Sequence, residues 1–371
     1  MGTSQRVLAS HALDTLLTAL REDGYRCVGP QPRDGAIVFD TLGQAADLPW
    51  GWQDEQAPGH YRLQHADPSR AFAWANGPQA IKPLTFAPRE TLWESRIGAD
   101  GHLQFAATLP AGEKVAVIGA RACDLAALHL QDQHFLQGAH ADAYYAARRR
   151  NLFIVAVHCT APAATCFCAS TGDGPLCTAG FDLALHETDA GYLVAAGSEA
   201  GTSVLASLSL PEASGTQVAQ AEAAVAAAGE RQTRTLPSRN LRDLLFANLD
   251  HPQWDDVAAR CLSCGNCTAV CPTCFCHAEH DVPLLDGDQG RHYREWDSCF
   301  TEGHSYLAGI VIRSDTRLRY RQWLTHKLGG WHDQYGRSGC TGCGRCITWC
   351  PVGIDLTEEV ARIHATGGEH D

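Results

Sequence analysis

Two cysteine runs constrain this 371-residue chain more than any other feature of its sequence. Both have the pattern C-x2-C-x2-C-x3-C-P, and they consist of Cys261, Cys264, Cys267 and Cys271, and of Cys340, Cys343, Cys346 and Cys350. Three thiolates two residues apart on a glycine-containing loop can converge on three irons of one cubane, whereas the fourth, before proline, reaches the neighbouring cluster. The pattern therefore predicts two [4Fe-4S] clusters, one held by Cys261, Cys264, Cys267 and Cys350, and the other by Cys340, Cys343, Cys346 and Cys271.

Two zinc sites, or eight purely structural cysteines, are the alternatives. Zinc takes four ligands in paired sets, which would leave the last Cys-Pro of each run unexplained. The insertion between the runs, residues 272–339, contains two stretches that we read as helical, 301–312 and 319–327. We therefore predict that residues 237–371 form a mainly helical, ferredoxin-like domain with two clusters.

The rest of the composition indicates the cellular compartment of the chain and the classes of partner to expect. Seventeen cysteines favour metal ligation over disulfides if the chain is cytoplasmic, because thiols there are kept reduced. The chain opens on an amphipathic stretch and has no apolar run near the roughly 20 residues that cross a bilayer. The net charge of −13 argues against nucleic acid. We expect a cytoplasmic protein with neither membrane nor nucleic-acid partners.

The N-terminal part has the pattern of an α/β domain. A helix is predicted over 10–23, with leucines at helical spacing, and strands are predicted over 35–40, 114–119, 152–157 and 192–196. A helix starting at Cys123 joins the two most apolar strands, which indicates parallel pairing. We assign residues 1–197 to this domain and the Ala- and Ser-rich residues 198–236, with a helix near 217–228, to a connector. Helices over 241–249 and 254–259 then lead to the first run.

Four further cysteines follow the predicted parallel strands, namely Cys123, Cys159, Cys166 and Cys168. Ligands of α/β folds bind beside the carboxyl ends of the strands. We therefore predict that these four thiols are candidates for a third [4Fe-4S] cluster, with Asp124 and His158 as outer neighbours. The alternative is a set of free cysteines buried in the core.

The other cysteines are harder to assign. Three of them lie near the first run and lack a fourth partner unless His277 or His304 serves: Cys274, Cys276 and Cys299. A metal site, packing and shielding of a cluster all remain open for them. Cys27 and Cys177 are isolated, and we expect them to be structural.

No motif for a nucleotide or for covalent catalysis is found. The chain has no GxGxxG after a strand, no GxxxxGK[ST] and no GxSxG. We therefore expect no flavin or nucleotide in this chain, assign no catalytic residue, and expect catalysis in a partner subunit.

With these residues in view, the chain resembles the iron–sulfur beta subunits of cytoplasmic nickel–iron sulfhydrogenases, which couple hydrogen to NAD(P). It is similar as well to a sister group, the electron-transfer subunits of anaerobic sulfite reductases. The resemblance rests on DEQAPGHYRL (54–63), KPLTFAPRETLW (82–93), RACD (121–124), HCTAPAATCFC (158–168), STGDGP (170–175), RCLSCGNCTAVCPTCFC (260–276), REWDSCF (294–300), RYRQWLTHK (319–327) and GCTGCGRCITWCPVGIDL (339–356).

The resemblance implies a multi-subunit complex. In it this chain would pass electrons between a flavoprotein subunit that binds NAD(P) and the small and large subunits of a nickel–iron hydrogenase. Two alternatives stay open: the corresponding electron-transfer subunit of an anaerobic sulfite reductase, and a stand-alone iron–sulfur enzyme that uses the cysteines between 123 and 168.

Overall fold

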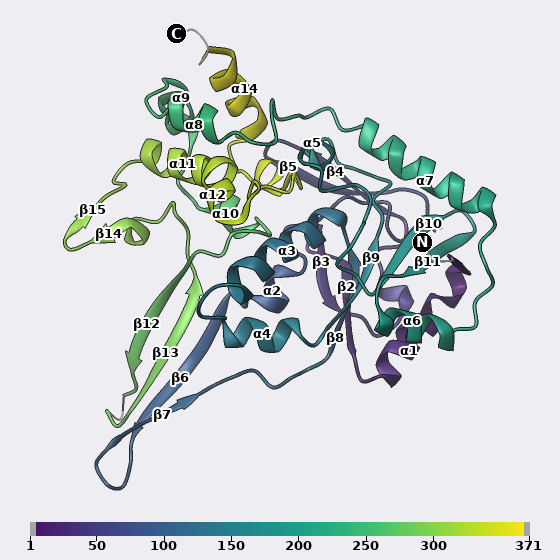
Figure 1. The fold of residues 1–371 in the computed structure, drawn as a ribbon, viewed down its shortest axis with the longest axis horizontal. Helices are drawn as coiled ribbons and strands as arrows, with labels where there is room; N and C mark the ends of the chain where they lie inside the picture. The colour runs from purple at the N-terminus through teal and green to yellow at the C-terminus, as the bar shows by residue number, and fades with distance from the viewer. Residues whose placement is uncertain (1–4, 286, 367–371) are drawn as a thin grey trace.

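The fold is described from a computed structural model that covers residues 5–285 and 287–366 (Figure 1). The parts of the predicted domains that fall on residues 1–4, 286 and 367–371 lie outside the described residues.

A seven-stranded mixed sheet forms the centre of the N-terminal part. In spatial order it consists of β1 (Arg6–Leu8), β11 (Gly191–Ala196), β10 (Leu183–Thr188), β9 (Leu152–Val157), β8 (Val115–Ala120), β2 (Arg26–Arg33) and β3 (Ala36–Thr41). Strands β2, β8, β9 and β10 are parallel neighbours, and the outer pairings are antiparallel. The parallel pair β8–β9 confirms the predicted α/β unit.

Helices cover both faces of this sheet because its strands are apolar on both sides. In β8, Ala116 and Ile118 belong to one core with the leucines of α1 (Leu13–Glu22), whereas Val115 and Val117 belong to a second core with α3 (Ala122–Leu136). This alternation follows from the period of two in a strand. Helix α4 (Ala143–Arg149) packs beside α3.

Residues 198–236, predicted as a connector, contain α6 (Glu199–Ser207) and α7 (Gly215–Glu230). The predicted helix near 217–228 is confirmed within α7. Both helices contact the sheet, α6 at β11 and α7 at β10, and Val204 of α6 is buried in the core with α1. This segment is thus packed on the N-terminal sheet along most of its length.

The C-terminal part contains most of the remaining helices: α8 (Arg242–Ala247), α9 (Gln253–Arg260), α10 (Asn266–Ala269), α11 (Thr316–Thr325), α12 (Trp331–Tyr335), α13 (Arg345–Thr348) and α14 (Leu356–Thr366). A π-helical turn, His326–Gly330, joins α11 to α12. The helices predicted over 241–249, 254–259 and 319–327 are found here.

The helix predicted over 301–312 is wrong. A short 3₁₀ turn (Gly303–Ser305) is followed by the hairpin β14 (Tyr306–Leu307) and β15 (Ile310–Val311). The two residues between the strands, Ala308 and Gly309, both have positive φ (48° and 91°). Two such residues give the tight turn whose twist matches paired strands, and a helix cannot accommodate them.

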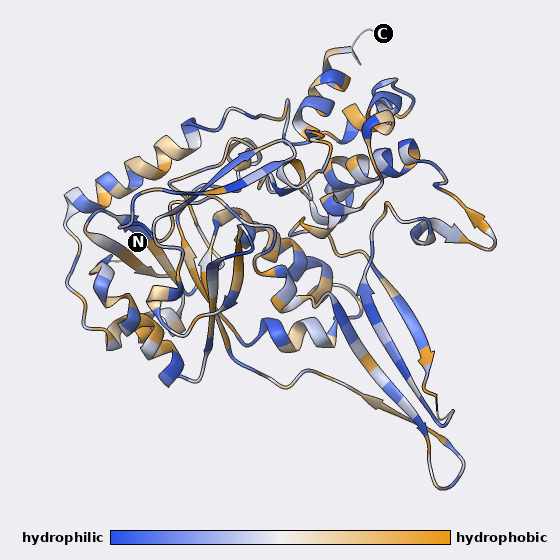
Figure 2. Ribbon diagram, turned by 180° about the vertical axis from the view of Figure 1, so that it is seen from behind, coloured by the Kyte–Doolittle hydropathy of each residue, from blue (hydrophilic) through white to orange (hydrophobic). Residues whose placement is uncertain are grey.

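A four-stranded sheet connects the two parts of the chain and projects from the body as an arm (Figure 1). Its order is β12 (His277–Pro283), β13 (Gln289–Trp296), β6 (Arg89–Ile97) and β7 (Leu103–Ala107). Figure 2 shows largely hydrophilic strands in this arm, in contrast to the central sheet. The insertion between the cysteine runs is therefore partly β-structure, so "mainly helical" describes the C-terminal part incompletely.

Several smaller elements complete the fold. They are the hairpin of β4 (Trp52–Ala57) and β5 (His60–His65), α2 (Lys82–Thr85), α5 (Cys168–Thr171), and the 3₁₀ turns Ser10–Ala12 and Ala45–Asp47. Within residues 5–285 and 287–366, no helix combines the length and apolar character needed to cross a membrane.

Candidate iron–sulfur sites

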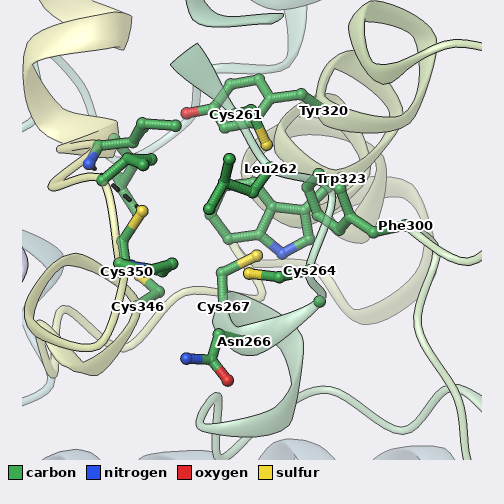
Figure 3. Close-up of a pocket in the computed structure, with 15 residues that line it drawn as sticks. Cys261, Leu262, Cys264, Asn266, Cys267, Phe300, Tyr320, Trp323, Cys346 and Cys350 are labelled. Atoms are coloured by element: carbon green, nitrogen blue, oxygen red, sulfur yellow. Dashed lines mark hydrogen bonds between the residues drawn. The ribbon is translucent and has the colours of Figure 1, made fainter.

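The four cysteines predicted to share the first cluster line one cavity (Figure 3). Cys261 follows the last residue of α9, Cys264 comes from the adjoining loop, Cys267 lies in α10, and Cys350 enters from the second run. The cavity contains about 460 Å³ of empty space, including its open mouth, and Cys346 also lines it. Cys264 is exposed, so this site lies near the surface.

Apolar side chains form the rest of this first cavity. Tyr320, Trp323 and Phe300 are nearly fully buried and surround the thiols, together with Leu356. Low polarity around a thiolate site limits water access and influences the redox potential of a bound cluster.

The second predicted set, Cys340, Cys343, Cys346 and Cys271, also lies together. Burial, together with the neighbouring thiols Cys343 and Cys271, raises the pKa of Cys340 to about 12. Burial likewise raises the pKa of Cys346, beside Cys340, Cys343, Cys271 and Cys267. Because Cys346 lies close to this set and also lines the first cavity, the two sites adjoin.

The two runs fold alike. Gly265 and Gly344 occupy the same position in their runs, and both begin a short helix with a left-handed backbone (φ 75° and 76°). At another equivalent position, the amide of Ser263 donates to Cys261 Sγ and the amide of Gly342 donates to Cys340 Sγ, each over 3.4 Å. Amides that donate to sulfur stabilise thiolate ligands and influence the potential of a cluster.

The donor set fits clusters better than single metal ions. Among residues 5–285 and 287–366, no three Cys, His, Asp or Glu side chains converge closely enough to hold one ion. Ligands of a cubane bind different irons and therefore surround the cofactor. Binding to iron also provides the positive charge that deprotonates buried thiols.

The third predicted set lies at the carboxyl edge of the central sheet. Cys123 is in the first turn of α3, Cys159 follows β9, Cys166 and Cys168 lie around the start of α5, and all four are buried. Cys123 and Cys168 pack against Cys343 of the second run. The third set is therefore adjacent to the second.

Two side chains bind sulfur atoms of this third set. Asn76 donates to Cys166 Sγ over 3.8 Å and to the carbonyl of Cys343 over 2.8 Å. Gln232 Nε2 donates to Cys168 Sγ over 3.3 Å. Neither residue was singled out from the sequence, because an isolated amide residue has no motif.

Close backbone packing joins the third set to the second run. The amide of Phe167 donates to the carbonyl of Gly342 over 2.8 Å. A Cβ atom on Gly342 would lie 2.6 Å from the Cα of Cys168, and one on Gly344 would lie 2.4 Å from the carbonyl oxygen of Thr165. Glycine is thus required at both positions by space as well as by φ.

Charged and polar side chains reinforce this interface. Arg345 Nη1 and Asp124 Oδ1 form an ion pair at 2.8 Å, and each side chain is 2% exposed. Asp124, which follows Cys123 in the sequence, thus pairs with an arginine of the second run. His158 instead accepts a hydrogen bond from the amide of Cys177 over 3.1 Å.

The β4–β5 hairpin adds a further connection to the second run. Thr348 donates to Gln56 over 2.7 Å and lies 2.8 Å from the hydroxyl of Thr165. The amide of Gly59 donates to the carbonyl of Ile347 over 3.1 Å. This role of the hairpin was not predicted from the sequence.

The unassigned cysteines occupy a separate cavity. Cys274, Cys276 and Cys299 line it together with His277, His304 and Lys327. Cys27 and Cys177 lie elsewhere in the cores of the N-terminal part, where Cys27 Sγ donates to the carbonyl of Leu17 over 3.8 Å.

Two protein families match parts of this chain. Residues 260–354 match the 4Fe-4S dicluster domain family, and residues 227–275 match a second family of 4Fe-4S dicluster domains. No solved structure matches this chain significantly.

A curated relative covers a larger part of the chain. The chain is 32% identical to sulfhydrogenase 2 subunit beta of Pyrococcus furiosus over 245 residues, which is 65% of this chain and 72% of the relative. The relative and the dicluster families together support an iron–sulfur electron-transfer role with [4Fe-4S] clusters. The chain belongs to the family of iron–sulfur beta subunits of sulfhydrogenases.

Proposed function

We propose that this chain conducts electrons between a flavoprotein subunit that binds NAD(P) and the small and large subunits of a nickel–iron hydrogenase. The observation that carries the proposal is the serial arrangement of three cysteine sets. Cys346 of the second set lines the first cavity, and Cys343 of the same set packs against Cys123 and Cys168 of the third. Such a series extends from the exposed Cys264 to the edge of the central sheet.

This arrangement supports the proposed ligand sets. Cys261, Cys264, Cys267 and Cys350 hold one [4Fe-4S] cluster, and Cys340, Cys343, Cys346 and Cys271 hold a second. A third is held by Cys123, Cys159, Cys166 and Cys168. Each bound cluster would supply one-electron redox chemistry.

The protein's own residues set the conditions at these sites. The amides of Ser263 and Gly342 donate to the sulfurs of Cys261 and Cys340, and the aromatic walls of the first cavity limit the access of water. Asn76 and Gln232 donate to the third set. Donors to sulfur favour the more reduced, more negative state of a cluster.

The partners are tested by purifying the complex. An affinity tag on this chain, used under anaerobic conditions in the native host, is expected to co-purify a flavoprotein and two nickel–iron hydrogenase subunits, identified by mass spectrometry. The complex is expected to reduce NAD(P) with hydrogen, while the isolated chain neither oxidises hydrogen nor reduces NAD(P). Recovery of a sirohaem sulfite reductase with the tagged chain would assign it to the alternative complex, and turnover by the isolated chain would contradict the conducting role.

The third cluster is tested in the full-length chain, because its cysteines pack against the second run. Cys166→Ser is expected to lower the iron content by about four per chain relative to the wild type. Cys27→Ser is the matched control, since Cys27 is also buried but belongs to the core that contains the leucines of α1. Equal iron content in both variants would eliminate the third cluster.

A further inference from the structure

Three cysteines outside the proposed ligand sets share one cavity. Cys274 and Cys276 lie on the loop that leads from the first run to β12, and Cys299 follows β13. Trp323 lines both this cavity and the first one, and Phe300, next to Cys299, lines the first. Trp323 therefore lies at the border between this cavity and the first cluster site.

A histidine provides a fourth donor. The imidazole of His304 lines the same cavity and lies beside the Cys276 thiol. Its Nδ1 lies 2.8 Å from Asp297 Oδ2. A carboxylate that holds one ring nitrogen and leaves the other free is the usual environment of a metal-ligating histidine. His277 instead contacts the carbonyl of Phe275.

Two buried lysines adjoin these thiols. Lys327 Nζ donates to Cys274 Sγ over 3.3 Å and to Thr273 Oγ1 over 2.8 Å, while Lys82 Nζ lies 3.7 Å from the ring centre of Trp296. Both side chains are 4% exposed, and neither has an ion pair with a carboxylate in the part of the chain that the structure describes. A buried ammonium is costly unless an anion compensates it.

Cys274 and Cys276 lie between the two lysines. Both thiols line the cavity that contains Lys327 and also a second one that contains Lys82. A group of thiolates bound to a metal cluster is anionic. Cys271 of the second set lies beside both lysines, and a further cluster held by Cys274 and Cys276 would add negative charge between them.

We propose that Cys274, Cys276, Cys299 and His304 bind an additional [4Fe-4S] cluster, with Lys82 and Lys327 as its buried counter-ions. This cluster lies beside the first and second sites, because Cys299 neighbours Cys267 and Cys274 neighbours Cys271. It forms a side branch of the series, and it does not depend on the third cluster.

A cluster accounts for these donors better than one zinc ion. The three thiols and the imidazole line one cavity, and among the residues that the structure describes no three such side chains lie close enough together to hold one ion. A zinc ion requires its four ligands within about 2.0–2.3 Å of one centre.

The proposal is tested by counting metals in the full-length chain. Anaerobic native mass spectrometry and iron analysis are expected to show a loss of about four irons per chain in both Cys276→Ser and Cys299→Ser, and none in Cys27→Ser. Loss of zinc in place of iron, or unchanged metal content in the folded variants, would overturn the proposal. Failure of the hydrogenase assignment would leave these counts unaffected.

A second measurement uses the unaltered chain, in case the variants do not fold. All other proposed ligands are sulfur, so a histidine nitrogen bound to a reduced cluster is a specific signature. Pulsed EPR of protein labelled with ¹⁵N-histidine is expected to show a directly coordinated nitrogen, which disappears in His304→Cys while the iron is retained. Absence of such a coupling in the wild type would overturn the assignment of His304.

Discussion

The equivalent glycines of the two runs offer a test of how closely the N-terminal part packs on the second cluster site. Gly265 and Gly344 have the same left-handed backbone conformation. Substitution by alanine at either position should lower the free energy of unfolding by about 1–2 kcal/mol, because a residue with a Cβ atom disfavours this φ. Their surroundings differ. A Cβ at 265 would lie 3.0 Å from the side-chain oxygen of Ser298, whereas one at 344 would lie 2.4 Å from the backbone oxygen of Thr165.

The second contact cannot relax easily, because the hydroxyl of Thr165 is itself bonded to Thr348 and Gln56. Forcing an extra carbon into such packing typically adds about 1–3 kcal/mol. We therefore expect Gly344→Ala to destabilise the protein by about 2–5 kcal/mol and Gly265→Ala by about 1–2 kcal/mol. The assay is anaerobic urea unfolding of the purified full-length chain, followed by the visible absorbance of the clusters. Equal midpoints for the two variants, or a lower midpoint for Gly265→Ala, would refute the reasoning.

Three further predictions concern single side chains. Cys264→Ala and Cys343→Ala should each remove or convert one cubane, which iron analysis and low-temperature EPR detect; normal iron and unchanged spectra would contradict the ligand sets. Arg345→Met should destabilise the chain by about 3–5 kcal/mol, because it leaves Asp124 buried and unpaired, and adding Asp124→Asn should restore most of the urea midpoint. Burial lowers the pKa of His186 to about 4, below the ordinary value of about 6.5, so its contribution to stability is complete above pH 6.5 and is lost as the pH falls toward 4. The thermal midpoint should therefore fall from pH 7 to pH 5 less steeply in His186→Gln than in the wild type; identical slopes would exclude this cause.

The two cysteine runs could be recognised in the sequence because their spacing is local and is typical of loops that bind [4Fe-4S] clusters. The central sheet was predictable for a similar reason: Val115–Ala120 and Leu152–Val157 are apolar throughout, as strands covered on both faces must be.

The arm and the hairpin at Tyr306–Val311 were not predicted. Strands β12 and β13 are polar on both faces, so they lack the alternation that indicates a half-buried strand, and β13 pairs with β6 from a distant part of the chain. The hairpin depends on positive φ at Ala308, which the residue type does not indicate.

The surroundings of the cysteines could not be predicted either. Asn76, Gln232 and Lys82 reach the thiols from segments far away in the sequence, and each is a single polar residue without a motif. Only the tertiary fold brings them beside sulfur. The sequence thus predicted which cysteines lie together but not the polar groups beside them.

The central claim is that electrons pass through this chain between hydrogenase and NAD(P). The most direct test is the purified complex with Cys343→Ala, since this cysteine lies where the second and third sets meet. We predict that hydrogen-dependent reduction of a viologen dye persists while hydrogen-dependent reduction of NAD(P) is lost. Reduction of NAD(P) at the wild-type rate by an intact variant complex would contradict the claim.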